Sequence, residues 1–532
     1  MVTVREAFFD VLRQTGMTRI FANPGSTEVP LLTDLPDDLD FVLCLHEASV
    51  IGAATGHALG NRQPAVSLLH TTAGLGNAVG ALATARANRA PLVVIVGQQD
   101  RRHLVNEPFL RGELENLAGD YPVWVATPPR ASDVPALVLR AYHEATLSGG
   151  PAIVIVPMDD WAAEYEGGRT AAPRRVEQAF GVDPAVIATV ADRLGAAARP
   201  TIVTGAGSYD PRTWAALVEL ADTLRCSVWQ EPFGGRAGFP QDSERFAGHL
   251  PAGRAELRAA LADNDLVLVV GTASLRQYGY EDGPLFADGV EVVVVTADPS
   301  EAARSVADLA VLTSVPDFCL MLAKLVGSTP VERVEQKAPL VVPGPRYAEG
   351  QSLRAGHVFA ALRTRLPADT VLVEESPSSR SELQNVLPAR NTLGFVSAAM
   401  GGLGFAMPAA IGLRLACPDR PVVAIVGDGS SMYSFQSLWT AQRYGVGVLF
   451  VILSNGGYAI MDGLASAAGG TAPWPSFGDI DIDRLASSLG CTALRITEHA
   501  RLLEVLDEVV PTLPDRTSPL LLNIVVDPQP LA

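Results

Sequence analysis

The sequence predicts an α/β protein made of three doubly wound parallel-sheet domains, and three observations support this prediction. Short runs rich in β-branched residues alternate with longer amphipathic stretches along the whole chain, which is typical of repeated βα units. The alternation occurs in three successive blocks separated by two stretches without such patterns. The chain has 532 residues, 48% of them apolar and 18% charged, which is enough for about three or four domains with buried cores.

The first block, residues 1–165, contains five apolar runs short enough to be strands buried on both faces of a sheet. These runs are Arg19–Ala22, Phe41–Leu45, Ala65–Leu69, Leu92–Val96 and Ala152–Val156. Helix-length segments separate them. In Thr72–Ala90, apolar residues recur at helical spacing and form one face, at Leu75, Val79 and Leu82. We therefore expect parallel strands with helices on both sides of the sheet.

The second and third blocks, residues 180–330 and 350–532, repeat this pattern. Strands are predicted in the second block at Thr201–Thr204, Ser227–Gln230, Leu266–Val270 and Val290–Thr296. In the third block they are predicted at Thr370–Glu374, Val422–Val426, Gly447–Leu453 and Leu520–Val526. The polar segment Asp159–Val176 and the proline-rich segment Gly327–Ser352 are interpreted as linkers.

Charge and cysteine content exclude several classes of function. With 40 Lys and Arg against 58 Asp and Glu, the net charge is −18, so we expect no nucleic acid and no membrane partner. The five cysteines form no Cys-x-x-Cys pair, which argues against a disulfide framework or a zinc site. The apolar runs are too short to span a bilayer and the N-terminus lacks a signal-peptide pattern, so a cytoplasmic location is expected.

Two predicted strand ends in the third block favour a site for a phosphate group and a cation. Gly427-Asp428-Gly429 follows one strand, and Asn455 follows the next, with 25 residues between them. Ligands of parallel sheets bind beyond the carboxyl ends of the strands. Glycines let the backbone approach a phosphate closely, and carboxylate and amide oxygens suit a hard cation. Two unrelated βα turns are the structural alternative.

Three polar side chains in the first block, Glu47, His70 and Ser26, also follow predicted strands closely. Each has a structural explanation when taken alone. Glu47 would favour the N-terminus of the next helix through the helix dipole, and a single histidine at a strand end is more often structural than catalytic. Together they converge on one edge of one sheet, where such folds carry out chemistry.

These motifs resemble those of a known family. The segments Asn23-Pro24-Gly25-Ser26, Glu47, Leu69–Gly74, Gly401–Ala410 and Gly427–Gly429 with Asn455 stand in the order found in thiamine diphosphate-dependent 2-oxo acid decarboxylases. The resemblance covers essentially the whole chain and is closest to the benzoylformate decarboxylases. The motifs are highly specific for the cofactor and much less specific for the substrate.

The resemblance implies a pyrimidine-binding, a central and a diphosphate-binding domain, in that order, with the cofactor between two subunits. A homodimer is then the minimal active unit, and a homotetramer is the expected assembly. Glu47 is implied to hydrogen-bond the aminopyrimidine ring, and Leu403 to bend the cofactor. Mg²⁺, or Ca²⁺ in its place, is implied on the diphosphate, bound by Asp428, Asn455 and the carbonyl group of Gly457.

The resemblance also assigns further contacts and a reaction. Additional cofactor contacts are implied at Gly401, Gly427, Gly429, Ser430, Ser431, Tyr458 and Glu375; for Glu375 a helix cap is the alternative. His70 is implied to handle protons, and Ser26 to orient the substrate carboxylate. Because thiamine diphosphate accepts the electrons that decarboxylation leaves behind, the expected enzyme is a carboxy-lyase that converts a 2-oxo acid to an aldehyde and carbon dioxide.

The substrate pocket departs from the family pattern. The matching stretch Gly271–Glu281 lacks the family's second active-site histidine, and Tyr278 or Tyr280 is expected in its place. The expected lining consists of Pro24, Ser26, His70, Tyr278, Pro377, Ser397, Ile460, Met461 and Leu464. An apolar 2-oxo acid, aromatic or branched, is therefore expected. Because tyrosine is a weak acid near neutral pH, a carboligase that forms 2-hydroxy ketones, as acetolactate synthases do, is the alternative.

Two further motifs have structural interpretations. Thr204–Ser208 contains half of a nucleotide-binding fingerprint, and Gly-x-Gly without a third glycine is a weak signal. We therefore expect the central domain to bind no nucleotide. Arg101-Arg102-His103 is a short charge run that we expect in a solvated loop.

Overall fold

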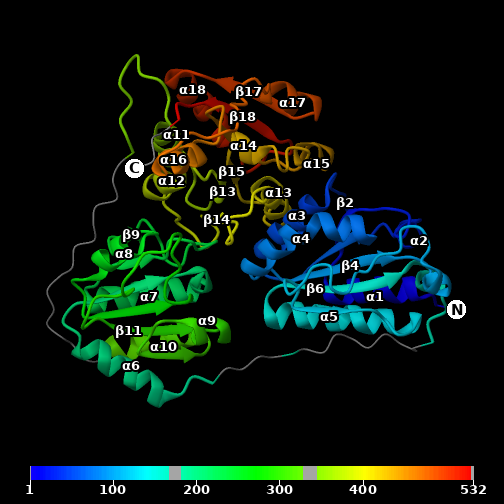
Figure 1. Cartoon of the computed structure of the whole chain (residues 1–532), viewed down its shortest axis with the longest axis horizontal. Helices are drawn as coiled ribbons and strands as arrows, with labels where there is room; N and C mark the ends of the chain where they lie inside the picture. Colours follow the sequence, from blue (N-terminus) through cyan, green and yellow to red (C-terminus); the bar gives the residue numbers. More distant parts are fainter. Residues whose placement is uncertain (1, 167–175, 177–180, 328–343, 529–532) are drawn as a thin grey trace. The chain divides into compact units, whose positions relative to one another are not determined.

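The structure is a computed structural model of the chain and describes residues 2–166, 176, 181–327 and 344–528 (Figure 1). It contains three six-stranded parallel sheets flanked by helices, which confirms the predicted fold class. Contacts divide the chain into two compact units. One comprises residues 1–178, 373–378 and 398–532, and the other comprises residues 179–372 and 379–397.

The first sheet has the strand order β2-β1-β3-β4-β6-β5, so β1 lies between β2 and β3. Its strands are β1 (Arg19–Asn23), β2 (Asp40–Leu43), β3 (Ala65–His70), β4 (Leu92–Gln98), β5 (Trp124–Ala126) and β6 (Pro151–Pro157). The five predicted strands of this block correspond to five of them. The prediction missed β5, whose three residues are all only half-buried at the edge of the sheet.

Helices cover both faces of this sheet (Figure 1). The five are α1 (Val4–Thr15), α2 (Val29–Leu32), α3 (Glu47–Asn61), α4 (Thr71–Ala87) and α5 (Val134–Ser148). The α1 helix begins at a capping box between Thr3 and Glu6 and ends at Gly16, whose φ of 74° suits a residue without a Cβ. The helices α3 and α4 directly follow β2 and β3, so their N-termini open at the carboxyl edge of the sheet.

The second sheet has the order β12-β11-β10-β7-β8-β9. Its strands are β7 (Pro200–Thr204), β8 (Val228–Gln230), β9 (Phe246–His249), β10 (Leu266–Val270), β11 (Glu291–Thr296) and β12 (Leu309–Leu312). The helices are α6 (Pro184–Ala196), α7 (Pro211–Leu224), α8 (Arg254–Leu261), α9 (Pro299–Arg304) and α10 (Val315–Gly327). Gly207, from the partial nucleotide-binding motif Thr204–Ser208, packs closely against Gly271. A Cβ at Gly207 would lie 2.7 Å from the Gly271 carbonyl oxygen, so the glycine is explained by packing.

The third sheet has the order β14-β13-β15-β16-β18-β17. Its strands are β13 (Val371–Glu375), β14 (Val396–Ser397), β15 (Val422–Gly427), β16 (Leu449–Ser454), β17 (Thr492–Ile496) and β18 (Leu520–Val525). The helices are α11 (Ala355–Arg363), α12 (Arg380–Val386), α13 (Ala406–Ala416), α14 (Asp428–Ser431), α15 (Ser437–Arg443), α16 (Ala459–Ala467), α17 (Ile482–Ser488) and α18 (His499–Val509).

The helices α3 and α13 pack with their backbones in direct contact. A Cβ on Gly56 would lie 2.0 Å from the Ala409 carbonyl oxygen, and a Cβ on Gly412 would lie 1.9 Å from that of Ala53. Only small residues allow two helices to approach this closely. This explains why α3 is rich in alanine and glycine, and it fixes the helix that begins with Glu47.

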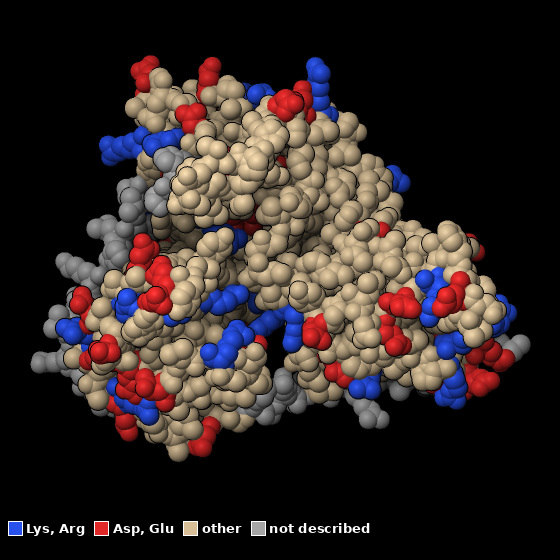
Figure 2. Space-filling view, viewed as in Figure 1, with Lys and Arg blue, Asp and Glu red and all other residues tan. Residues whose placement is uncertain are grey.

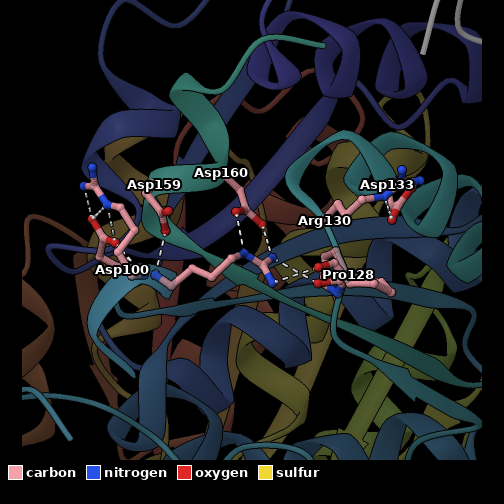
Figure 3. Close-up of polar contacts among 9 residues, drawn as sticks. Asp100, Pro128, Arg130, Asp133, Asp159 and Asp160 are labelled. Atoms are coloured by element: carbon pink, nitrogen blue, oxygen red, sulfur yellow. Dashed lines mark hydrogen bonds and ion pairs between the residues drawn. The ribbon is translucent and has the colours of Figure 1, made fainter. Parts of the chain in front are cut away.

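The charge run at residues 101–103 differs from its interpretation as a solvated loop. The Arg101 guanidinium lies 2.6 Å from Asp160 Oδ2 and also donates to the carbonyl oxygen of Pro128 (Figure 3). Asp160 is 1% exposed, and burial raises the pKa of its carboxyl group against the opposing effect of Arg101. Asp160 belongs to a 3₁₀ turn, Met158–Ala162, so the linker predicted at Asp159–Val176 begins later than expected. Of this predicted linker, residues 167–175 lie outside the described residues.

Charged side chains of both signs are intermingled on the part of the molecule that Figure 1 draws in green, as Figure 2 shows. On the face drawn, this part presents no broad basic surface among its described residues. Within the described ranges, every helix is too short or too polar to cross a lipid bilayer.

Candidate active site

The order of the first sheet brings Glu47, Ser26 and His70 to one edge. His70 ends β3, Ser26 follows β1, and Glu47 opens α3 after β2, and these three strands are neighbours. Ser26 and Pro24 are exposed on the turn after β1. The arrangement places a carboxylate, an imidazole and a hydroxyl at the carboxyl end of the sheet, which is where parallel sheets bind their ligands.

The Glu47 carboxylate is held by two amide groups. Asn23 donates to one oxygen at 2.9 Å, and Asn77, on α4, donates to the other at 3.1 Å. Glu47 is 9% exposed. Asn77 was not predicted, although it lies seven residues after His70, two helical turns along the same face. The two amides fix the carboxylate in one orientation at the N-terminus of α3.

The His70 ring is held by the turn between β1 and α2. Its Nδ1 lies 2.8 Å from Thr27 Oγ1 and 3.1 Å from Glu28 Oε2. Its side chain is 17% exposed, whereas that of Glu28 is 4% exposed. A Cβ on Gly25 would lie 2.3 Å from the His70 ring, so glycine is required for this packing. Thr27 and Glu28 were not predicted as functional.

Asp428 and Asn455 follow the adjacent strands β15 and β16. Asp428 is 6% exposed, and its two oxygens accept the backbone N–H groups of Gly429 at 2.8 Å and Gly456 at 2.7 Å. Asn455 Oδ1 accepts the N–H of Gly457 at 3.1 Å. Burial raises the pKa of Asp428, which is the effect that a bound cation would offset.

A cavity of about 320 Å³ adjoins these residues; its lining includes Asp428, Asn455, Gly456, Phe477 and Arg495. The carboxylate oxygens of Asp428 and the amide oxygen of Asn455 are hard ligands, which suit a hard cation. In the part of the chain that the structure describes, no three His, Cys, Asp or Glu residues are grouped as metal ligands. A cation here would therefore rest on one carboxylate, neutral oxygens and phosphate oxygens, which is how Mg²⁺ is commonly bound with phosphates.

The predicted phosphate-binding residues differ in their surroundings. A Cβ on Gly427 would meet nothing closer than Ser430 Oγ at 3.6 Å, so the backbone is open there. At Gly429 a Cβ would lie 2.6 Å from the Tyr458 ring, so there is no room for a side chain. The Ser431 hydroxyl is fully buried and donates to the Asp428 carbonyl oxygen at 2.7 Å, while Ser430 is 6% exposed.

The Glu375 carboxylate caps the helix α13. Its oxygens accept the N–H groups of Gly404, Phe405 and Ala406, each at 2.7 Å. Burial raises the pKa of Glu375 to about 7 against these donors. The bonds hold the turn that contains Leu403, which is 36% exposed. Gly401 begins this turn with a φ of 75°.

The predicted pocket-lining residues belong to both units. Three of them, Ile460, Met461 and Leu464, lie in the same unit as Glu47, on the helix α16, which has no buried residue. Pro377 belongs to this unit too and is exposed after β13. In the other unit, Tyr278 is 75% exposed on a loop, whereas Ser397 is fully buried. The Ser397 hydroxyl has no hydrogen-bond partner among the described residues.

Three family models match the chain. They are described as the N-terminal TPP binding domain of thiamine pyrophosphate enzymes, at residues 2–119, the central domain, at residues 187–322, and the C-terminal TPP binding domain, at residues 379–524. A benzoylformate decarboxylase of Pseudomonas aeruginosa is 35% identical over 511 residues, which cover 94% of this chain and 95% of that protein.

Two further relatives have lower sequence identity. The solved structure of a thiamine diphosphate-dependent 4-hydroxybenzoylformate decarboxylase from Rhodococcus jostii RHA1 has a TM-score of 0.94 and 33% identity, with all of both chains covered. The acetolactate synthase large subunit of Parasynechococcus marenigrum is more distant, at 28% identity, covering 96% of this chain and 86% of that protein.

Proposed function

The chain belongs to the thiamine diphosphate-dependent decarboxylase family, and on that basis we propose that it decarboxylates an apolar 2-oxo acid, aromatic or branched, without oxidation. The products are an aldehyde and carbon dioxide. The observation that most supports this proposal is the buried Glu47 carboxylate, which Asn23 and Asn77 hold at the edge shared with His70. Relatives named as benzoylformate decarboxylases support the substrate class.

The cofactors of this proposal are thiamine diphosphate and Mg²⁺, which Ca²⁺ could replace. The open backbone at Gly427 and the hard oxygens of Asp428 and Asn455 fit a diphosphate with its cation. We assign the cation to Asp428, Asn455 and the carbonyl group of Gly457. Further contacts are proposed at Gly401, Leu403, Gly429, Ser430, Ser431, Tyr458 and Glu375.

When bound, thiamine diphosphate supplies the electron sink for the pair of electrons that carbon dioxide leaves behind. The chain supplies orientation, proton transfer and the exclusion of water. Glu47, held by its two amides, would hold the aminopyrimidine ring by a hydrogen bond and exchange a proton there. His70 moves protons at the reacting carbon, and Ser26 orients the substrate carboxylate. Glu375 keeps the Leu403 turn in place.

The apolar lining supports the substrate class. Met461 and Leu464 are 43% and 38% exposed on α16, directly after the strand end that carries Asn455. Exposed apolar side chains beside a polar site favour an apolar substrate group. We propose that Pro24, Pro377 and Ile460, which belong to the same unit, complete this part of the pocket. For Tyr278 and Ser397, which belong to the other unit, the pocket role stays a prediction from the sequence.

A carboligase is the second candidate function. The stretch Gly271–Glu281 contains no histidine, so protonation of the carbon that loses carbon dioxide could be slow and an acceptor could trap it. The 28% identity to an acetolactate synthase supports this alternative. The two functions differ in product, since the carboligase yields a 2-hydroxy ketone and needs an acceptor.

The same proposal includes a homodimer as the active unit, a homotetramer as the assembly and a cytoplasmic location. The segment between β4 and β5 of the first sheet carries two large exposed side chains, Val105 at 86% and Phe109 at 88%. Apolar side chains this exposed are expected where another subunit covers them.

The experiment that tests the site is the replacement Glu47→Gln, which keeps the shape of the side chain and removes its charge. We expect turnover to fall to background, while binding of thiamine diphosphate, measured by calorimetry, changes little. Asp419→Asn, at an exposed position, is the control and should keep full turnover. Unchanged turnover in Glu47→Gln would contradict the assigned role.

A further inference from the structure

His70 is surrounded on one side by oxygen atoms whose roles can be deduced. Its Nδ1 lies within hydrogen-bond distance of both Thr27 Oγ1, at 2.8 Å, and Glu28 Oε2, at 3.1 Å. Thr27 Oγ1 in turn lies 2.5 Å from Glu28 Oε1 and donates to it. Thr27 Oγ1, the Glu28 carboxylate and His70 Nδ1 therefore form a closed triangle of contacts.

With the Glu28 carboxylate ionised, the triangle permits only one neutral tautomer of His70. An ionised carboxylate only accepts hydrogen bonds, so the Thr27 hydroxyl gives its hydrogen to Glu28. The remaining lone pair of Thr27 and the second oxygen of Glu28 then both face Nδ1. Two acceptors at Nδ1 require a hydrogen on that nitrogen, and the other ring nitrogen, Nε2, is left with its lone pair.

We propose that Glu28, together with Thr27, is a positioning residue that keeps His70 in the Nδ1–H tautomer, so that Nε2 is the atom that exchanges protons at the reacting carbon. The inference rests on the proposed function for its use of His70. Glu28 does not touch the reacting atoms and acts only through the histidine.

The chain is built to hold Glu28 in this place. The backbone N–H of Gly25 donates to Glu28 Oε2 at 2.8 Å. On the neighbouring strand β4, a Cβ at Gly97 would lie 1.8 Å from Glu28 Oε1, so only glycine leaves room for the carboxylate. Thr71, the residue after His70, has a φ of 40°, a strained value for a β-branched residue. Such strain persists where the surrounding structure fixes a functional group.

Replacing Glu28 with glutamine tests the inference. The N–H of Gly25 would keep the amide oxygen in the place of Oε2, so that the amide nitrogen faces Thr27 Oγ1. The Thr27 hydroxyl then gives its hydrogen to Nδ1, which favours the opposite tautomer. The readout is the ¹⁵N spectrum of the full chain labelled at its eight histidines, with His70 assigned from its loss in His70→Ala. We expect a protonated Nδ1 in the unmodified protein and a protonated Nε2 in Glu28→Gln. Glu113→Gln, at a side chain that is 88% exposed, should leave the spectrum unchanged. An Nδ1–H tautomer in Glu28→Gln would overturn the inference.

Kinetics provide the second readout. Glu28→Gln should lower kcat about 100-fold, within the range for loss of a proton-transfer group, with little change in KM. In a His70→Ala background the same replacement should have no further effect, since Glu28 acts through the histidine. Equal losses in both backgrounds would overturn the inference. Full activity of His70→Ala would instead refute the role of His70 in the proposed function, and the tautomer measurement would stand separately.

A second variant covers the case in which Glu28→Gln does not fold. Thr27→Val removes the hydroxyl between the carboxylate and the ring, and should lower kcat about 10-fold and alter the pH profile of kcat. Thr27→Ser keeps the hydroxyl and should restore both. An unchanged pH profile and kcat in Thr27→Val would overturn the inference.

Discussion

The side-chain amide of Asn77 donates to Glu47 Oε2 at 3.1 Å and so links the first residue of α3 to the second turn of α4. Asn23, at the end of β1, holds the other oxygen at 2.9 Å. The carboxylate is thus fixed from two elements that follow or end neighbouring strands. Its orientation is set by the fold before any ligand binds.

We predict that Asn77→Ala lowers kcat/KM by about 10- to 100-fold, because a small displacement of a catalytic group is costly. The α4 helix should remain folded, since alanine favours helix. Carbon dioxide release under first-order conditions measures the effect. Asn61→Ala, at an exposed position of α3, is the matched control and should have no effect. Equal kcat/KM values for the two variants would contradict the role of Asn77.

Removal of the cation should abolish activity. Dialysis against a chelator is expected to reduce carbon dioxide release to background, and Mg²⁺ or Ca²⁺ should restore it, since both prefer oxygen ligands. Asp428→Asn should weaken the affinity for Mg²⁺ by at least about tenfold, because it removes the charged ligand. Titration of the dialysed protein measures this affinity. Full activity after complete removal of divalent cations would refute the site.

Acid should destabilise the protein through His57. Burial, and to a smaller extent the charge of Arg19, together lower the pKa of His57 to about 4. Because the unfolded chain then binds more protons than the folded one, the free energy of unfolding should fall as the pH drops from about 6.5 to about 4, by about 3 kcal/mol. Above pH 6.5 this contribution is fully present.

The variant His57→Gln should flatten this dependence, as measured by urea midpoints between pH 7 and pH 4. Some dependence should remain, because burial also lowers the pKa of His249, to about 3. His103→Gln, at an exposed residue, is the control and should behave like the unmodified protein. A profile for His57→Gln that parallels the unmodified protein would contradict the assignment.

The pair of Arg101 and Asp160 should contribute to stability rather than to catalysis. Arg101→Ala leaves a carboxylate that is 1% exposed without its partner, and should cost about 3 kcal/mol in the free energy of unfolding. Adding Asp160→Asn should recover part of the loss. Arg102→Ala breaks a pair that is largely exposed and should not change the urea midpoint measurably. Loss of turnover without loss of stability would contradict this account.

Much of the fold could be predicted because strands buried on both faces appear as short apolar runs. The strands that were missed include β5, β12 and β17, whose residues are mostly half-buried or exposed. Such edge strands lack a continuous apolar run. They form because a neighbouring strand offers unpaired backbone N–H and C=O groups, and the sequence of the edge strand itself does not show this.

Two pairs of strand-end residues could be predicted, Glu47 with His70 in the first sheet and Asp428 with Asn455 in the third. Within each sheet, parallel strands present their carboxyl ends together. The partners of these residues could not be predicted. Asn77 meets Glu47, and Glu28 meets His70, because of how helices and strands that are distant in sequence pack together. Arg101 illustrates the same limit, since its partner Asp160 is 59 residues away.

The measurement that tests the account most directly is carbon dioxide release from a panel of 2-oxo acids, with thiamine diphosphate and Mg²⁺ present, and with the organic product identified. We predict fast release from an aromatic or branched acid without any added acceptor, and an equal amount of aldehyde. Release that occurs only when an acceptor is added, with a 2-hydroxy ketone as the product, would contradict the decarboxylase and identify a carboligase.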